Sequence, residues 1–176
     1  IDYSLKKSGL VELLDYLKKN NKKLALASSS EKDRVDFLVD REGVRNYFDL
    51  IISSDNIVEG KPNPEIFNFA MEKLNADKNK TYILEDSLSG IKAAKASGAV
   101  AVLIVDLDDS ELIKNEADLV FSSLEEFLDF LKNKNNIDTR NKDFSLSCPS
   151  CKEKFTKSLP TAIFSLNDKD FIENVG

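Results

Sequence analysis

Helical and extended patterns alternate along the first three quarters of this sequence, and the alternation constrains the fold more than any other feature. Apolar residues recur at the three- and four-residue spacing of amphipathic helices, and short apolar runs separate these segments. The predicted helices cover 10–17, 30–43, 65–74, 89–97 and 124–131, and the predicted strands cover 24–27, 48–52, 82–84, 99–105 and 119–121. Such alternation predicts right-handed βαβ units, and therefore an α/β domain over residues 1–132 with helices on both faces of a parallel sheet.

Composition and charge exclude several classes of protein. The chain has 176 residues, of which 41% are hydrophobic and 32% charged, as in an ordinary globular domain. A net charge of −6 argues against nucleic acid as a partner. The longest apolar run, Ala99–Val105, is too short to span a bilayer, and the first residues do not resemble a secretory leader. We expect no membrane association and a cytoplasmic location.

The regular pattern ends at Asn133. Residues 133–143 are rich in Asn and charge and are predicted to be a linker, and residues 144–176 to form a small C-terminal appendix. This appendix holds the two cysteines of the chain, Cys148 and Cys151, which are too few for a disulfide framework. Their Cys-x-x-Cys spacing resembles half of a zinc ribbon. We expect a surface turn, and the alternative is a zinc site completed by a second chain.

The residues able to carry chemistry are limited, because the sequence contains no histidine. Triads that use Ser, His and Asp, Cys–His pairs and His-ligated metals are therefore excluded. Carboxylates, lysines and hydroxyls remain. Three such groups fall where an α/β sheet binds ligands: Ser28 after the first strand, Lys61 in the loop after the second, and Glu85–Asp86 at the end of the third.

Each group has a structural and a functional interpretation. Ser28–Ser30 can cap a helix, or can receive phosphate oxygens beside the free N–H groups of a helix start. Lys61 lies between Gly60 and Pro62, which restrict the loop and aim one ammonium group. Glu85 and Asp86 can belong to a solvated loop, or can hold a cation that relieves their repulsion, and Mg²⁺ prefers such oxygen ligands.

The stretches that hold these residues resemble a known family. They are LALASSS at Leu24–Ser30, GKPNPEIF at Gly60–Phe67 and ILEDSLSGIKAAKASGA at Ile83–Ala99. In order and spacing they resemble the haloacid dehalogenase (HAD) superfamily, specifically its beta-phosphoglucomutase-like branch, over Leu5–Leu131. The resemblance implies a three-layer α/β/α Rossmannoid core. It also implies Mg²⁺-dependent phosphoryl transfer through an aspartyl phosphate, by a phosphatase or phosphosugar mutase acting on a phosphorylated small metabolite such as a sugar phosphate.

The resemblance also implies roles for individual residues. Ser28 would bind the transferring phosphoryl group, and Lys61 would stabilise that group and the nucleophile. Asp86 would ligate Mg²⁺, and Glu85 would complete or support the metal site. The neighbouring orienting groups would be Ser29 and Ser87.

One part of the family pattern is absent. The first motif, an Asp-x-Asp near the N-terminus that supplies the nucleophile and the general acid/base, is missing, and so is the helical cap that selects substrate. In the family that motif ends a mid-sheet strand, between the strands ending here at Ala27 and Leu84. We therefore expect this chain alone to be inactive and poorly stable, with the missing strand supplied by a longer N-terminus or by a second chain. The alternative is a non-catalytic phosphate- or partner-binding module built on the same core.

A second Asp-x-Asp occurs elsewhere in the sequence. Asp106–Ser110 reads Asp-Leu-Asp-Asp-Ser after an apolar strand, as the first motif would. In the family this strand is the edge strand beyond the one that ends in Glu85 and Asp86. We therefore predict an ordinary loop here, and a permuted enzyme with Asp106 as nucleophile is the alternative.

Overall fold

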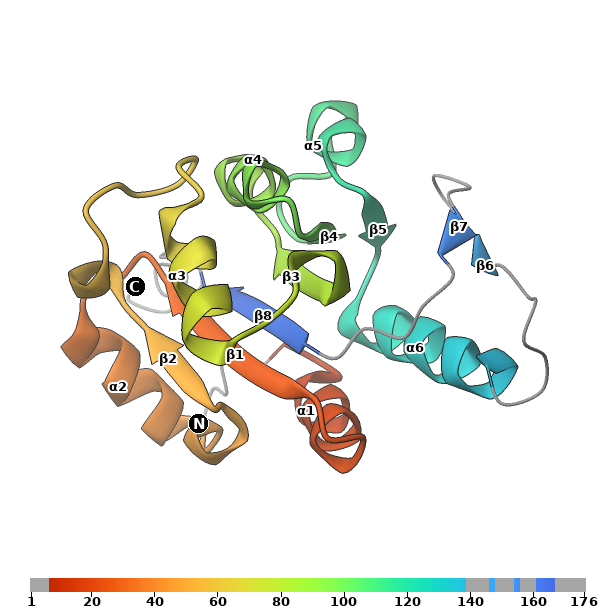
Figure 1. Cartoon of the computed structure of the whole chain (residues 1–176), viewed down its shortest axis with the longest axis horizontal. Helices are drawn as coiled ribbons and strands as arrows, with labels where there is room; N and C mark the ends of the chain where they lie inside the picture. Colours follow the sequence, from red (N-terminus) through yellow and green to blue (C-terminus); the bar gives the residue numbers. More distant parts are fainter. Residues whose placement is uncertain (1–6, 139–145, 148–153, 156–160, 167–176) are drawn as a thin grey trace.

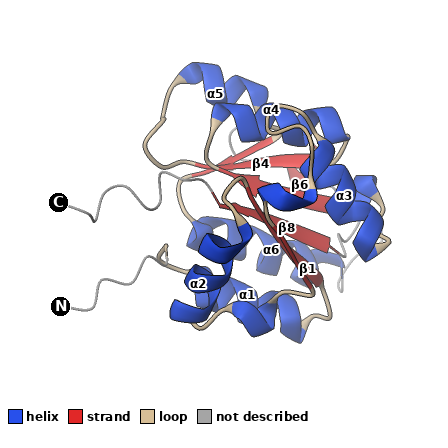
Figure 2. Ribbon diagram, turned by 90° about the vertical axis from the view of Figure 1, so that its left-hand side faces the viewer, coloured by secondary structure: helices blue, strands red, loops and turns tan. Residues whose placement is uncertain are grey.

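The fold is a parallel sheet covered by helices on both faces (Figures 1 and 2). The computed structural model describes residues 7–138, 146–147, 154–155 and 161–166. The helices are α1 Leu10–Lys19, α2 Lys32–Arg41, α3 Glu65–Leu74, α4 Leu88–Ser97, α5 Glu111–Glu116 and α6 Leu124–Asp138. The strands are β1 Lys23–Ser28, β2 Leu50–Ile52, β3 Thr81–Glu85, β4 Val100–Ile104, β5 Leu119–Phe121, β6 Leu146–Ser147, β7 Lys154–Phe155 and β8 Thr161–Leu166.

Six parallel strands form the sheet in the order β2-β1-β8-β3-β4-β5. Alternate residues of each strand face opposite helical layers, as the pleat requires. Leu24 and Leu26 of β1 pack with α1, α2 and α6, whereas Ala25 and Ala27 pack with α3, α4 and α5. The predicted three-layer α/β/α architecture is confirmed, and no cap domain is present among the described residues.

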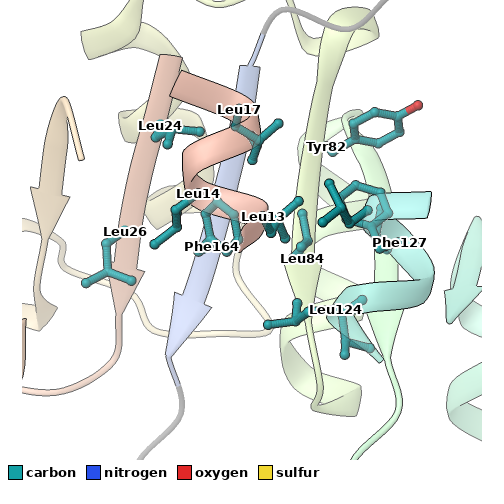
Figure 3. Close-up of a cluster of buried hydrophobic side chains, with 14 of the residues drawn as sticks. Leu13, Leu14, Leu17, Leu24, Leu26, Tyr82, Leu84, Leu124, Phe127 and Phe164 are labelled. Carbon is teal, nitrogen blue, oxygen red and sulfur yellow. The ribbon is translucent and has the colours of Figure 1, made fainter. Parts of the chain in front are cut away.

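The C-terminal strand β8 lies in the middle of this sheet, between β1 and β3. Its register pairs Phe164 with Leu26 on one side and with Leu84 on the other. Phe164 is buried beneath Leu13 and Leu14 of α1 (Figure 3). The mid-sheet position, for which the sequence predicts an upstream segment or a second chain, is therefore filled by this chain.

This placement corrects the predicted domain boundaries. The sequence predicts that residues 161–166 lie in an appendix, yet they belong to the sheet of the core. The predicted linker at 133–143 also begins inside α6, which continues to Asp138. Lys134 is 4% exposed, and its ammonium donates to the Tyr82 hydroxyl at 3.3 Å. The polar composition of 133–138 concealed a helix that packs through the stem of a lysine.

Two further predictions concern the cysteine pair and membrane association. Cys148 and Cys151 lie outside the described residues, so the surface turn and the zinc alternative stay predictions. The short strands β6 and β7, which precede and follow them, pair antiparallel. Within the described part of the chain, no helix combines the length and apolarity needed to cross a membrane.

Candidate phosphate and metal site

A buried ion pair joins two of the predicted site residues. The Lys61 ammonium donates to Oε1 of Glu85, and the two side chains are only 4% and 0% exposed. Lys61 also lies 5.3 Å from the ring centroid of Phe67 on α3. Burying both charges removes them from water at a cost of several kcal/mol per ion, which the pair offsets only through close contact and further hydrogen bonds.

Glu85 receives those further hydrogen bonds at its second oxygen. Oε2 accepts from the Ser87 hydroxyl at 3.2 Å and from the Asp86 backbone N–H at 3.3 Å. The Ser87 oxygen in turn accepts from the N–H of Gly90 and caps α4. A Cβ at Gly90 would lie 1.9 Å from the Glu85 carboxyl carbon, so only glycine leaves room for this side chain. Glu85 is thus fixed as the partner of Lys61.

The carboxylate of Glu65 holds the start of the loop that carries Lys61 through two backbone hydrogen bonds. Glu65, in the first turn of α3, accepts from the backbone N–H groups of Val58 and Glu59 at 2.9 and 2.8 Å. These two hydrogen bonds hold the pKa of Glu65 below its usual value. The sequence around Lys61 marks only Gly60 and Pro62 as residues that restrict this loop, and nothing in it marks Glu65.

Ser28 ends β1 and is 1% exposed. Its hydroxyl oxygen accepts from the Ser30 N–H at 3.1 Å and so shapes the turn into α2, in which Ser29 is exposed. β8 lies between β1 and β3, so the backbone of Ser28 and that of Glu85 are separated by two interstrand spacings, or about 10 Å. The structure therefore brings Lys61 and Glu85 into contact, and it places Ser28 on the opposite side of β8 from Glu85.

Asp86 makes a different contact, one that sequence analysis did not predict. The Lys7 ammonium lies 3.0 Å from Oδ2 of Asp86 and 2.9 Å from Oδ2 of Asp106. Burial alone would lower the pKa of Lys7, but the two carboxylates outweigh that effect and hold it above its usual value. Nothing in the local sequence marks Lys7, because it precedes α1 as an ordinary lysine. Asp106, the nucleophile of the alternative permuted enzyme, shares this cation with Asp86.

The chemistry of these oxygens fits a magnesium ion. Two carboxylates approach a single positive charge, and Mg²⁺ is commonly held by one or two carboxylates, with waters and substrate phosphate completing six ligands. In the described ranges no three His, Cys, Asp or Glu side chains gather as a closed metal site.

Comparison with known proteins assigns the chain to a class. The model of the haloacid dehalogenase-like hydrolases matches residues 4–105, which is more than half of the sequence. The chain therefore belongs to the haloacid dehalogenase-like hydrolase family. Within the family, its similarities fall in the beta-phosphoglucomutase-like branch.

Individual relatives support this placement. A phosphorylated carbohydrates phosphatase of Thermotoga maritima is 32% identical over 126 residues, covering 70% of this chain and 58% of the relative. A Thermotoga maritima structure provisionally named a beta-phosphoglucomutase has a TM-score of 0.67 and 33% identity, covering 72% of this chain and 59% of that one. CbbY of Rhodobacter sphaeroides, solved with xylulose-1,5-bisphosphate, has a TM-score of 0.63 and 29% identity, covering 68% and 55%. The chain thus spans less than two thirds of the proteins that it matches.

Proposed function

We propose that this chain is the core portion of a Mg²⁺-dependent phosphatase or phosphosugar mutase that acts on a phosphorylated small metabolite, most simply a sugar phosphate. The observation that carries the proposal is the buried Lys61–Glu85 pair next to Asp86 at the carboxyl edge of the sheet. A scaffold has no physical need to bury an ammonium group and a carboxylate there. The relatives named above act on phosphorylated carbohydrates or bind a sugar bisphosphate.

Each residue then has a physical role. Lys61 neutralises phosphate oxygens, and a charge-assisted hydrogen bond of this kind contributes about 1.5 to 3 kcal/mol. The Ser28 hydroxyl binds the phosphoryl group from the other side of β8, with Ser29 beside it. Glu85 and Ser87 hold Lys61 in position. Asp86 holds Mg²⁺, which when bound neutralises further phosphate charge.

The second candidate is a phosphate-binding module without turnover, and the position of β8 favours it. In the family the mid-sheet strand ends in the nucleophilic carboxylate. Here that position belongs to β8, which ends in Phe164, Ser165 and Leu166, with Ser165 paired to Ala27 directly before Ser28. A serine at this register position cannot form an aspartyl phosphate. We therefore propose that the chain alone binds phosphate and does not hydrolyse its ester.

One experiment tests both candidates. The chain and its Ser165→Asp and Ser165→Asn variants are titrated with inorganic phosphate by calorimetry and then assayed with Mg²⁺ for phosphate release from a panel of sugar phosphates. We expect all three to bind phosphate and only Ser165→Asp to release it, because Asn has the same shape without the nucleophilic charge.

The other outcomes distinguish the candidates. Binding in every variant without turnover in any would favour the binding module. Turnover by the unaltered chain would establish phosphoryl transfer and disprove the inactivity of the chain. Absence of phosphate binding in all variants would contradict both candidates.

A further inference from the structure

The Lys7 side chain bridges two aspartates that follow neighbouring strands of the sheet. Asp86 directly follows β3, and Asp106 follows β4 after one intervening residue. These strands are paired, so both aspartates lie at the edge where parallel sheets bind ligands. Lys7 reaches them from the segment that leads into α1, with an ammonium hydrogen bond to each.

The surroundings show which charges Lys7 balances. Glu85, which ends β3 directly before Asp86, is already paired with Lys61. The side chain of Asp86 is 15% exposed and that of Asp106 is 42% exposed. The positive charge of Lys7 therefore lies between one largely buried and one accessible carboxylate, at oxygens suited to a divalent cation.

We propose that Lys7 is an internal cation that occupies the Mg²⁺ position at Asp86 and Asp106, so that Mg²⁺ binds by displacing the lysine side chain. This inference rests on the proposed role of Asp86 and adds two residues to it: Asp106 as a second oxygen ligand and Lys7 as the competitor. An ammonium and Mg²⁺ require the same carboxylate oxygens, and their like charges prevent both from binding there together.

The side chain of Lys7 is suited to leave. It is 35% exposed and ends a flexible four-carbon stem, so its ammonium can move into water without unfolding α1. Competition of this kind lowers the affinity for Mg²⁺, because the intrinsic affinity is multiplied by the fraction of molecules whose carboxylates are free. If Lys7 is engaged in about nine molecules of ten, its removal strengthens Mg²⁺ binding about tenfold.

The test measures Mg²⁺ binding directly, by calorimetry with MgCl₂ as the only added ligand. We compare the unaltered chain with Lys7→Met, Asp106→Asn and Asp86→Asn. Lys95→Met is the matched control, because Lys95 pairs with Asp118 away from this edge. We expect Lys7→Met to strengthen binding about tenfold, Asp106→Asn to weaken it, Asp86→Asn to abolish it, and Lys95→Met to leave it unchanged.

A second measurement follows Lys7 itself in the unaltered sequence and uses a conservative variant only to assign its signal. Lysine side chains carrying ¹³C-methyl groups are observed by NMR while Mg²⁺ is added, and Lys7→Arg assigns the Lys7 signal. Displacement moves that signal towards the position of an exposed lysine with the same midpoint as the calorimetric titration.

The outcomes separate this inference from the proposed function. If Mg²⁺ binds and Asp86→Asn abolishes binding, while Lys7→Met changes nothing and the Lys7 signal stays in place, the inference is wrong and the role of Asp86 stands. If neither the chain nor Lys7→Met binds Mg²⁺, the inference fails together with the metal role of Asp86. The phosphate titration above then still tests the rest of the proposed function.

Discussion

At the residue scale, the site depends on a charge pair that is almost inaccessible to water. Lys61 and Glu85 stabilise the fold only as a pair, because either charge left alone would stay buried without compensation. The chemical type of both residues could be predicted from the sequence, since each lies at the carboxyl end of a predicted strand or in its loop. Their direct contact could not, because it depends on the space left by Gly90 and on the loop folded by Glu65.

The pair predicts strong non-additivity between two substitutions. Lys61→Met leaves the Glu85 carboxylate buried and unpaired, and we expect it to lower the free energy of unfolding by about 3 to 5 kcal/mol. Glu85→Gln in the Lys61→Met background removes the buried charge and keeps an acceptor for Ser87. We therefore expect the double variant to be more stable than Lys61→Met alone. Urea denaturation of both single variants and the double variant measures this coupling.

The control for this cycle is an exposed ion pair. Lys32 and Asp36 lie one turn apart on α2, and the Lys32 side chain is 66% exposed. We expect Lys32→Met to leave the urea midpoint unchanged. Equal destabilisation by Lys61→Met alone and by the double variant would show that Glu85 is not left with an uncompensated charge.

At the scale of elements, the local pattern predicted most helices and strands, and tertiary contacts determined the rest. Helical periodicity identified α1 and α3 because each buries one continuous apolar stripe, whereas α4 was identified by its alanine-rich composition and the glycine that ends it. It missed the last turns of α6, whose polar residues include the buried Lys134. It also missed β8, in which a short apolar run stands in a polar region and takes its structure from β1 and β3.

The junction between β1 and β2 carries a prediction about pH. Asp49, just before β2, accepts from the Leu24 N–H at 2.8 Å and from Lys18 at 3.0 Å. Burial alone would raise its pKa, but these two donors lower it below the usual value. Its stabilisation is therefore complete above the unfolded pKa near 3.9 and is lost as the pH falls through the lower folded pKa.

We accordingly expect Asp49→Asn to cost about 1 kcal/mol at pH 7, at the low end for a charged hydrogen bond because the side chain is 40% exposed. The difference from the unaltered chain shrinks progressively from about pH 5 to below pH 3. Thermal unfolding of both proteins across this range measures it. A difference that stays constant with pH would show that ionised and protonated Asp49 stabilise the fold equally, which would contradict the lowered pKa.

At the scale of the whole molecule, the sequence determined the fold class but not the strand order. Strand order is inferred from the rule that consecutive strands usually pair or lie close together. This chain breaks the rule, because its final strand enters the centre of the sheet. The resemblance indicated an empty place between β1 and β3. Only the structure shows that residues 161–166 fill it and so join β1 and β3 into one continuous sheet.

This topology makes the C-terminal strand a determinant of overall stability. Phe164 is 6% exposed, packs edge-on against Phe48 at 6.0 Å, and lies between β1 and β3, which share no hydrogen bonds with each other. We expect Phe164→Ala to lower the free energy of unfolding by about 3 to 5 kcal/mol. Phe37→Ala, at a side chain that is 63% exposed, is the matched control and should change it little. Urea denaturation measures both.

Hydrogen exchange then distinguishes a central strand from a peripheral one. If β8 joins the two halves of the sheet, Phe164→Ala should accelerate exchange of amides in both β1 and β3, because each loses its partner when β8 opens. The edge pair of β4 and β5 should be affected least, since its ladder does not include β8. Faster exchange confined to β8 itself, with β1 and β3 protected as before, would mean that the sheet closes without this strand and that its central position is not what stabilises the domain.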